Sequence, residues 1–400
     1  MVNDNRSVAA GRGEALRTDP VVQRPVYRIL FVITGLDYGG AETQLRDLAI
    51  AFGRRGLSVG VVSMMLPAAY VDDLANAGIH VWSLGMRRKS ANPTTIWRLA
   101  HIVHEFNPDV VHSHEIHANL LARVSRAVGW RKIPLVCTAH SVNEGGRLRM
   151  CAYRVTDRWA SITTNVSQAA VSRYVAIGAA PRGRIVYMPN GVDTLRFSPD
   201  NERRTAARQA LGIMADQPTL LAVGRFAEVK NHSGMLHAFA RVVDAYPNAL
   251  LLLAGQGPLL NATRALSEAL HLSNSVRFLG IRRDIPDLMR AGDLYLMTSL
   301  CEGLPIVLLE AAASGLPAVV TNVGGNASAV LDGISGRIVP PNNDEALAAA
   351  VIEVLNMSPE ARQSWGHAAR QLVQSSFSLA SVVDRWLGLY TSLVMPTAPR

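Results

Sequence analysis

Residues 301–312 read CEGLPIVLLEAA and follow a short apolar run at 294–297 that has the composition of a buried strand. Glu302 falls in the loop after this run, and Gly303 is expected to let the backbone approach a ligand closely. Pro305 suits the first turn of a helix, whose N-terminus offers unpaired N–H groups and a positive dipole end. The stretch therefore predicts a strand, a loop and a helix whose end can seat a diphosphate.

Glu310 is the one charged residue in the helix expected after Pro305, where its neighbours are valine, leucine and alanine. A helix this apolar is expected to be buried, and a buried carboxylate needs hydrogen-bond partners. Two ribose hydroxyl groups could donate to it. A core glutamate bonded to the backbone or to an arginine is the alternative, and the sequence leaves both open.

Short apolar runs alternate with helical patterns along the whole chain, which indicates parallel sheets. The runs do not alternate polar with apolar residues, as is typical of strands buried on both faces. We expect an α/β protein built from two Rossmann-like, doubly wound parallel-sheet domains that face a central cleft. The expected strands are 27–33, 58–64, 110–114, 134–139, 161–165 and 184–188, then 219–223, 249–254, 276–279, 294–297, 318–320 and 336–339.

The length of 400 residues suits two domains, each with its own core. Residues 1–26 carry four arginines and no apolar block, so we expect a disordered basic tail there. A turn-rich stretch near residues 189–215 marks the boundary between a first domain at 27–205 and a second at 206–376. Residues 377–395 carry a helical pattern.

Composition indicates a globular protein, with 49% hydrophobic and 18% charged residues. The three cysteines are odd in number and lack metal-ligand spacing, which favours a reducing cytoplasm over a disulfide framework. No apolar run approaches the ~18 residues that suggest a membrane-spanning helix. We therefore expect a cytoplasmic protein.

Positive charge is concentrated in the first half of the chain. Residues 1–205 hold 26 Lys and Arg against 16 Asp and Glu, whereas residues 206–400 hold 14 against 15. A basic half favours anionic partners such as an anionic membrane or a phosphorylated substrate, and an Arg-rich solvated surface is the alternative. No nucleic-acid-binding motif accompanies the charge, so no nucleic-acid partner is expected.

Three further motifs follow expected strands, where open parallel sheets bind their ligands. Residues 223–231 read VGRFAEVKN, and Arg225 and Lys230 can bind phosphate oxygens there, although each alone is an ordinary surface charge. Gly39 and Gly40 precede a helix and can clear space for a phosphate or a sugar. His140 ends the run 135–139 and is a candidate polar contact or general base, or a structural histidine.

Other sites are excluded by spacing. His112, His114 and His117 do not match a known ligand pattern, and no Asp-x-Asp occurs, so no metal is expected. The pair at Gly255 and Gly257 lacks the third glycine of a dinucleotide fingerprint, and no Walker-type or Gly-x-Ser-x-Gly motif is present.

Taken together, these motifs resemble family 4 of the retaining glycosyltransferases, which have the GT-B fold. The resemblance runs from about residue 28 to about residue 393, and its most specific part is the pair Glu302 and Glu310 with seven residues between them. Supporting matches are 39–42 (GGAE), 189–193 (PNGVD), 253–258 (LAGQGP) and 278–280 (FLG). Cys301 stands where the family more often has a small or polar residue.

The resemblance implies a role for each candidate residue. Arg225 and Lys230 would neutralise the donor diphosphate, and His140 would face the reacting sugar from the first, acceptor-side domain. The C-terminal helix would cross back onto that domain. The implied catalytic residues are His140, Arg225, Lys230 and Glu302, and the implied donor-binding residues are Gly39, Gly40, Gly303, Leu304, Pro305 and Glu310.

The expected activity is that of a hexosyltransferase moving a sugar, with retention, from a nucleotide diphosphate sugar to a glycan or lipid-linked acceptor. Cell-surface polysaccharide or glycolipid synthesis is the expected setting, with peripheral association with an anionic membrane. A UDP-sugar is favoured and GDP-mannose is the alternative donor. Two cations and a helix end can stabilise the leaving group, so no metal or other cofactor is expected.

Two other functions remain open on the sequence. One is an epimerase or a phosphorylase of the same fold. The other is a glycosyltransferase-like subunit that binds a partner and catalyses nothing, against which the presence of Arg225, Lys230, Glu302 and Glu310 argues.

Overall fold

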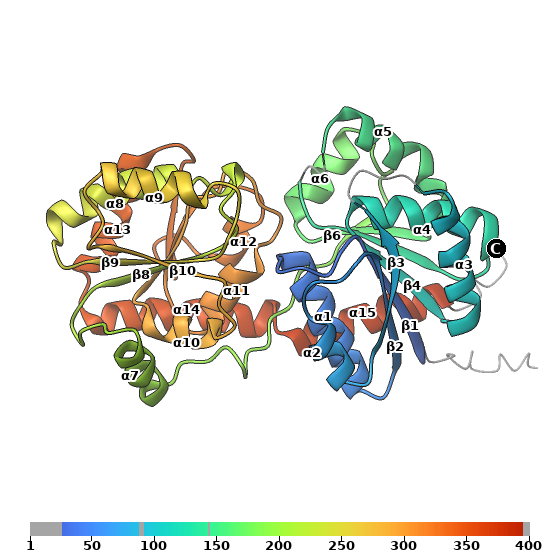
Figure 1. Ribbon diagram of the computed structural model, residues 1–400, viewed down its shortest axis with the longest axis horizontal. Coiled ribbons are helices and arrows are strands. Elements are labelled where there is room, and N and C mark those ends of the chain that lie inside the picture. Colours follow the sequence, from blue (N-terminus) through green and yellow to red (C-terminus); the bar gives the residue numbers. More distant parts are fainter. Residues whose placement is uncertain (1–25, 88–91, 143–144, 395–400) are drawn as a thin grey trace, which may run out of the picture.

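The computed structural model describes residues 26–87, 92–142 and 145–394, and two parallel sheets organise them (Figure 1). The first sheet has the order β3-β2-β1-β4-β5-β6-β7, and the second has the order β10-β9-β8-β11-β12-β13. Both sheets grow outward from their first strand in two directions, which is the doubly wound topology. The expected α/β class with two such sheets is confirmed. The basic tail at 1–25 lies outside the described residues.

The strands of the first sheet are short, and β4 and β5 are buried along their whole length. Their bounds are β1 Arg28–Ile33, β2 Ser58–Met65, β3 His80–Met86, β4 Val110–His114, β5 Leu135–Ala139, β6 Ile162–Asn165 and β7 Ile185–Tyr187. The helices of this half are α1 Gly40–Arg54, α2 Val71–Asn76, α3 Thr94–Phe106, α4 Ile116–Gly129, α5 Arg147–Thr156 and α6 Gln168–Ala176.

The strands of the second sheet begin and end within one residue of the expected runs. Their bounds are β8 Thr219–Val223, β9 Leu250–Ala254, β10 Val276–Gly280, β11 Leu294–Met297, β12 Ala318–Thr321 and β13 Gly336–Val339. The accompanying helices are α7 Asn201–Ala210, α8 His232–Ala245, α9 Leu260–Ala269, α10 Ile285–Ala291, α11 Ile306–Ala313, α12 Asn326–Ala329, α13 Asp344–Asn356 and α14 Pro359–Ser376. Apolar clusters fill both faces of each sheet, which explains the continuous apolar runs.

Strand β3 was absent from the sequence-based expectation. It pairs with β2 alone and lies at the edge of the first sheet. Of its seven residues only Leu84 is fully buried. A half-exposed edge strand lacks the continuous apolar run by which the buried strands were predicted.

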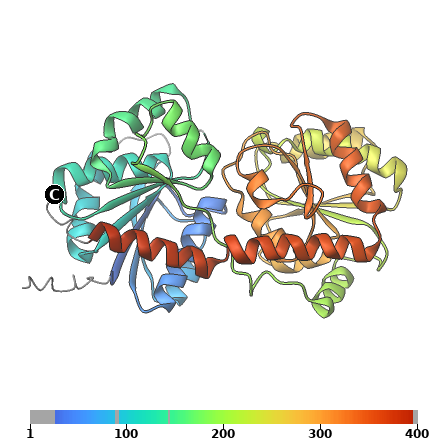
Figure 2. The same cartoon turned by 180° about the vertical axis from the view of Figure 1, so that it is seen from behind.

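The last helix, α15 Leu379–Val394, joins the two halves. It follows α14 along one side of the molecule and packs on the first half (Figure 2). Val382, Val383, Trp386 and Tyr390 are buried in the core beside β1 and α1. Because Gly191 lies against the start of α15, a side chain there would press on Leu379 and Val382. None of the described helices has the length and apolar composition needed to cross a membrane.

Candidate functional site

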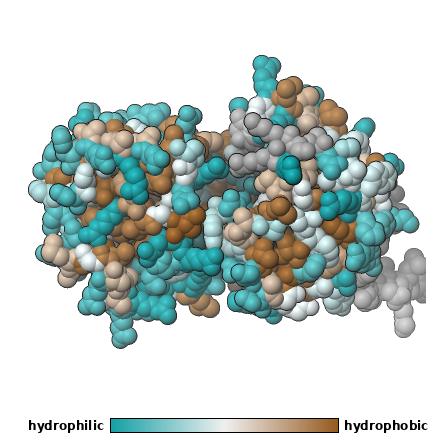
Figure 3. Space-filling model, in the orientation of Figure 1, coloured by the Kyte–Doolittle hydropathy of each residue, from teal (hydrophilic) through white to brown (hydrophobic). Residues whose placement is uncertain are grey.

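One cleft between the two sheets contains every site residue proposed from the sequence. It has a volume of about 2260 Å³ and is lined by residues that follow the carboxyl ends of strands in both halves. The space-filling view shows two lobes with a furrow between them (Figure 3). The predicted residues found in the lining are His140, Arg225, Lys230, Glu302, Gly39, Gly40, Gly303, Leu304, Pro305 and Glu310.

Lys230 and Glu302 form an ion pair inside the cleft. The Lys230 Nζ lies 2.5 Å from Oε1 of Glu302, and the two side chains are 24% and 11% exposed. The loop that carries Lys230 is held by Thr298, whose hydroxyl donates to the Lys230 carbonyl at 2.9 Å. The sequence placed both residues in the site but did not indicate that they bind each other.

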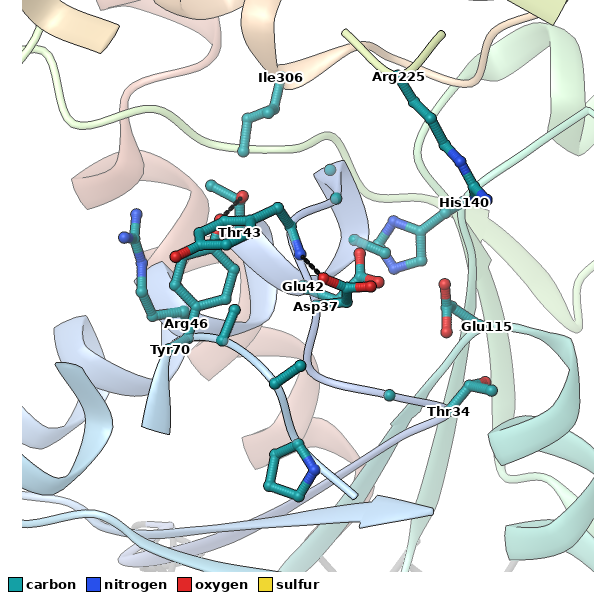
Figure 4. A pocket seen from close by; sticks show the side chains of 18 of the residues that line it. Thr34, Asp37, Glu42, Thr43, Arg46, Tyr70, Glu115, His140, Arg225 and Ile306 are labelled. Atoms are coloured by element: carbon teal, nitrogen blue, oxygen red, sulfur yellow. Dashed lines mark hydrogen bonds between the residues drawn. The ribbon is translucent and has the colours of Figure 1, made fainter. Parts of the chain in front are cut away.

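Arg225 extends from the end of β8 into the cleft, toward His140 (Figure 4). Its loop packs directly on the loop after β9. A Cβ at Gly255 would overlap the Gly224 carbonyl, and one at Gly257 would overlap the backbone of Phe226. The two glycines at 255 and 257 are thus needed for the two loops to approach each other.

Glu310 is 7% exposed, lines the cleft, and accepts no hydrogen bond from any residue in the described part of the chain. Burial raises the pKa of its carboxyl to about 8. Nearby Asp47 raises it further, and Arg196 and Arg46 lower it. The alternative of a core glutamate satisfied by the backbone or an arginine is therefore not what the described residues show. The carboxylate has acceptor capacity for a ligand.

In the loop before α11 the carbonyl groups accept hydrogen bonds from other segments, whereas the N–H groups are available to the cleft. The Gly303 carbonyl accepts from Gly325 N at 2.6 Å, and the Leu304 carbonyl accepts from Asn190 Nδ2 at 2.6 Å. No described acceptor bonds the N–H groups of Gly303 and Leu304. Together with the first turn of α11, these N–H groups suit an anion.

Close packing explains why position 303 is a glycine, and the sequence did not suggest this explanation. A Cβ at this position would overlap the carbonyl oxygen of His140 and lie 3.0 Å from Val166. Glycine here lets the second half come into contact with the first half beside the cleft. Pro305 immediately precedes α11 rather than lying within its first turn, with φ −71° and ψ 122°.

Three carboxylates that were not among the predicted site residues group on the first half. Figure 4 shows Asp37, Glu42 and Glu115 close together beside His140. Burial raises the pKa of Glu42 to about 8, with Glu115 and Asp37 adding to the rise and Arg225 opposing it. A Cβ at Gly39 would overlap the Glu42 carboxylate, whereas nothing lies near Gly40.

Glu115 has an unusual backbone, with φ 71° and ψ 156°. A non-glycine residue in this region carries backbone strain of about 1–3 kcal/mol. Burial raises the pKa of its carboxyl. Its position directly after β4 is the signal that could have identified it, because residues after strands of a parallel sheet face the cleft.

Some histidines at the strand ends line the cleft, and the others are buried. His117 and His140 line the cleft. His112 is fully buried, with its Nδ1 2.6 Å from the Tyr390 hydroxyl and its Nε2 2.6 Å from Thr138 Oγ1. His114 is also fully buried, and its Nδ1 lies 2.9 Å from Nε2 of His140. Within the described ranges, no three His, Cys, Asp or Glu side chains form a group suited to a metal ion.

Comparisons with known proteins agree on one family. Residues 38–196 match the model described as Glycosyltransferase Family 4, and residues 203–372 match the model described as Glycosyl transferases group 1. The putative glycosyltransferase EpsF of Bacillus subtilis is 30% identical over 310 residues, which are 74% of this chain and 79% of that protein.

Two further similarities extend over most of the chain. A GDP-mannose-dependent monoacylated alpha-(1-6)-phosphatidylinositol monomannoside mannosyltransferase of Corynebacterium glutamicum is 28% identical over 371 residues, 88% of this chain and 94% of that protein. The crystal structure of Anabaena Alr3699/HepE in complex with UDP and glucose superposes with a TM-score of 0.82 at 21% identity, covering 92% of this chain and all of that one.

Proposed function

The chain belongs to the group 1, family 4 glycosyltransferases of GT-B fold and is a hexosyltransferase, and we propose that it transfers its sugar with retention from a UDP-sugar to a glycan or lipid-linked acceptor. The UDP donor is supported by the similar structure that holds UDP and glucose. GDP-mannose is the alternative, since a relative is named for it.

The observation that carries this proposal is the buried, unpartnered carboxylate of Glu310. Burying a carboxylate without partners is costly, and a ligand that brings hydrogen-bond donors offsets that cost. Ribose brings two adjacent hydroxyl groups. Since α11 starts at Ile306, a ribose on Glu310 leaves the diphosphate within reach of the N–H groups at the start of the same helix.

Both charges that develop in the reaction have side chains of opposite sign in the cleft. As the bond between the anomeric carbon and the diphosphate breaks, negative charge grows on the leaving group, which Arg225, Lys230 and the α11 N-terminus stabilise. The sugar becomes positively charged, and Glu302 in the cleft lining can stabilise that charge. The acceptor oxygen forms the new bond, and its proton passes to the departing diphosphate.

The acceptor side also carries a surface suited to an anionic membrane. Along α5 and the turn after it, Leu148 is 88% exposed and Val155 is 59% exposed. The exposed cations of the same helical face are Arg147, Arg154 and Arg158, and Arg149 reaches the cleft lining. Exposed apolar residues between arginines are typical of a helix lying on a membrane surface. We propose that the acceptor lies on a membrane and that the enzyme acts at its cytoplasmic face.

A panel of sugar nucleotides tests the proposal. Saturating donor at about 100 times its dissociation constant should stabilise the fold by about 2.7 kcal/mol, and the same donor should be hydrolysed slowly without acceptor. UDP-glucose and UDP-galactose are compared with GDP-mannose, and the product anomer is determined by NMR. Stabilisation by none of them, or release of an epimerised free sugar, would overturn the proposal.

A further inference from the structure

His114 and His140 lie edge to edge. Their Nδ1 and Nε2 atoms are 2.9 Å apart, their ring centroids are 5.1 Å apart, and their planes differ by 26°. Rings in face contact would have atoms about 3.5–4.0 Å apart over their surfaces. The geometry is that of a direct hydrogen bond between two imidazoles.

Such a bond contains one proton, so one nitrogen donates and the other accepts. Burial lowers the pKa of His140 to about 4 and that of His114 well below its usual value, so both rings are neutral near pH 7. Each ring therefore carries one N–H. The direction of the bond decides which nitrogen of His140 holds the proton.

The second nitrogen of His114 determines the direction. Its Nε2 is buried and has no hydrogen-bond partner. If His140 donated, His114 would carry its proton on Nε2 and leave a buried N–H unpaired, which proteins rarely do. If His114 donates from Nδ1, only a lone pair remains without a partner. The second arrangement puts the proton of His140 on Nδ1.

Resting on the proposed transferase function, we propose that His114 is a positioning residue that fixes His140 as a hydrogen-bond donor, protonated on Nδ1, and not as the base that takes the acceptor proton. In this tautomer one ring nitrogen of His140 holds the proton and the other accepts from His114, so neither offers a lone pair to the acceptor proton. His114 never touches the substrate, because it is fully buried behind His140. This replaces the general-base alternative for His140.

The tautomer can be read directly from the ligand-free protein. The full chain is labelled with ¹⁵N histidine, and the His140 signals are identified by their loss in His140→Gln. We expect Nδ1 of His140 to show the shift of a protonated nitrogen and Nε2 that of an unprotonated one. A protonated Nε2 would overturn the inference. Because no substrate is present, this result does not depend on the proposed function.

Variants of His114 connect the tautomer with turnover. His114→Leu removes the donor, so we expect both tautomers of His140 and about a tenfold lower kcat for UDP-glucose hydrolysis, equivalent to 1.4 kcal/mol. His114→Asn can supply an N–H near the former Nδ1, so it should recover the tautomer and most of the kcat. UDP affinity should stay unchanged in both variants.

A purely structural role predicts a different pattern. In that case His114→Leu lowers the melting temperature but leaves the tautomer and the kcat of the folded fraction unchanged, which would contradict the inference. If wild-type protein neither binds nor hydrolyses any sugar nucleotide, the proposed function fails while the tautomer result stands on its own.

Discussion

The Lys230 Nζ lies 2.5 Å from the Oε1 of Glu302, so a cation and a carboxylate of the cleft neutralise each other. The two residues are 72 positions apart and come from the loops after β8 and β11. A diphosphate that binds Lys230 must compete with this carboxylate. In the proposed mechanism the displaced Glu302 then binds hydroxyl groups of the sugar, and recognition of the two parts of the donor is coupled.

Glu302→Gln should therefore separate binding from turnover. Removing the competing charge should tighten UDP binding by about fivefold, if the lost hydrogen bond contributes about 1 kcal/mol. The kcat for donor hydrolysis should fall, because the amide stabilises a positive sugar less well. Isothermal titration with UDP measures the first effect. Glu345→Gln is the matched control, since it removes a carboxylate from an exposed ion pair with Arg241. Weaker UDP binding in Glu302→Gln would show that Glu302 does not compete with the diphosphate for Lys230.

Glu310→Gln should weaken UDP binding in a pH-dependent way. The pKa of Glu310 is raised to about 8 by burial, so the carboxyl is largely protonated at pH 6.5 and ionised at pH 9. Ribose hydroxyls donate to the ionised form, and binding therefore releases a proton. The affinity of the wild-type protein for UDP should rise with pH up to about 8. Glu310→Gln lacks the titrating carboxyl and should not show this rise.

At high pH the loss in Glu310→Gln should reach about ten- to a hundredfold, as expected for a hydrogen bond to a charged group worth about 1.5–3 kcal/mol. Glu42→Gln is the control, because the pKa of Glu42 is also raised to about 8 and could contribute its own pH dependence. Loss of melting temperature with unchanged UDP affinity would instead assign Glu310 to the core.

Strand ends explain why the sequence identified so much of this cleft. Arg225 and Glu302 follow β8 and β11, His140 follows β5, and continuous apolar runs predicted all three strands. In a doubly wound sheet that position alone brings residues to the same edge. The fold class and ten residues of the cleft lining were therefore predictable.

What the sequence did not indicate depends on contacts between distant segments. The Lys230–Glu302 pair, the overlap that excludes a side chain at Gly303, and the bond between His114 and His140 each join different loops or strands. Residue types and spacing contain no information on which side chains meet. Edge strand β3 was not predicted because only one of its residues is fully buried.

Transfer should survive chelation. In the proposed mechanism Arg225, Lys230 and the α11 N-terminus supply the positive charge at the leaving group, so we expect no divalent cation to be needed there. Donor hydrolysis in EDTA should equal that of untreated enzyme. Loss of turnover that manganese restores would show that a metal takes part.

Membrane binding should depend on α5 and on salt. Vesicles of equal parts phosphatidylglycerol and phosphatidylcholine should bind the protein at low salt and release it as salt rises, since exposed charges are screened beyond about 10 Å at 0.1 M. Leu148→Ser combined with Arg154→Ser should weaken binding. Leu195→Ser is the matched control because Leu195 is also 88% exposed. Equal binding at low and high salt would contradict this account.

The most direct test of the electrostatic mechanism is the comparison of kcat and donor affinity in Lys230→Ala. Lys230 is paired with Glu302 in the cleft, so a diphosphate gains little net binding energy from its charge. As the diphosphate leaves, the charge matters more, and an interaction made mainly in the transition state affects turnover. We predict a kcat at least tenfold lower with a much smaller change in the donor dissociation constant. Wild-type kcat in Lys230→Ala would contradict the central claim.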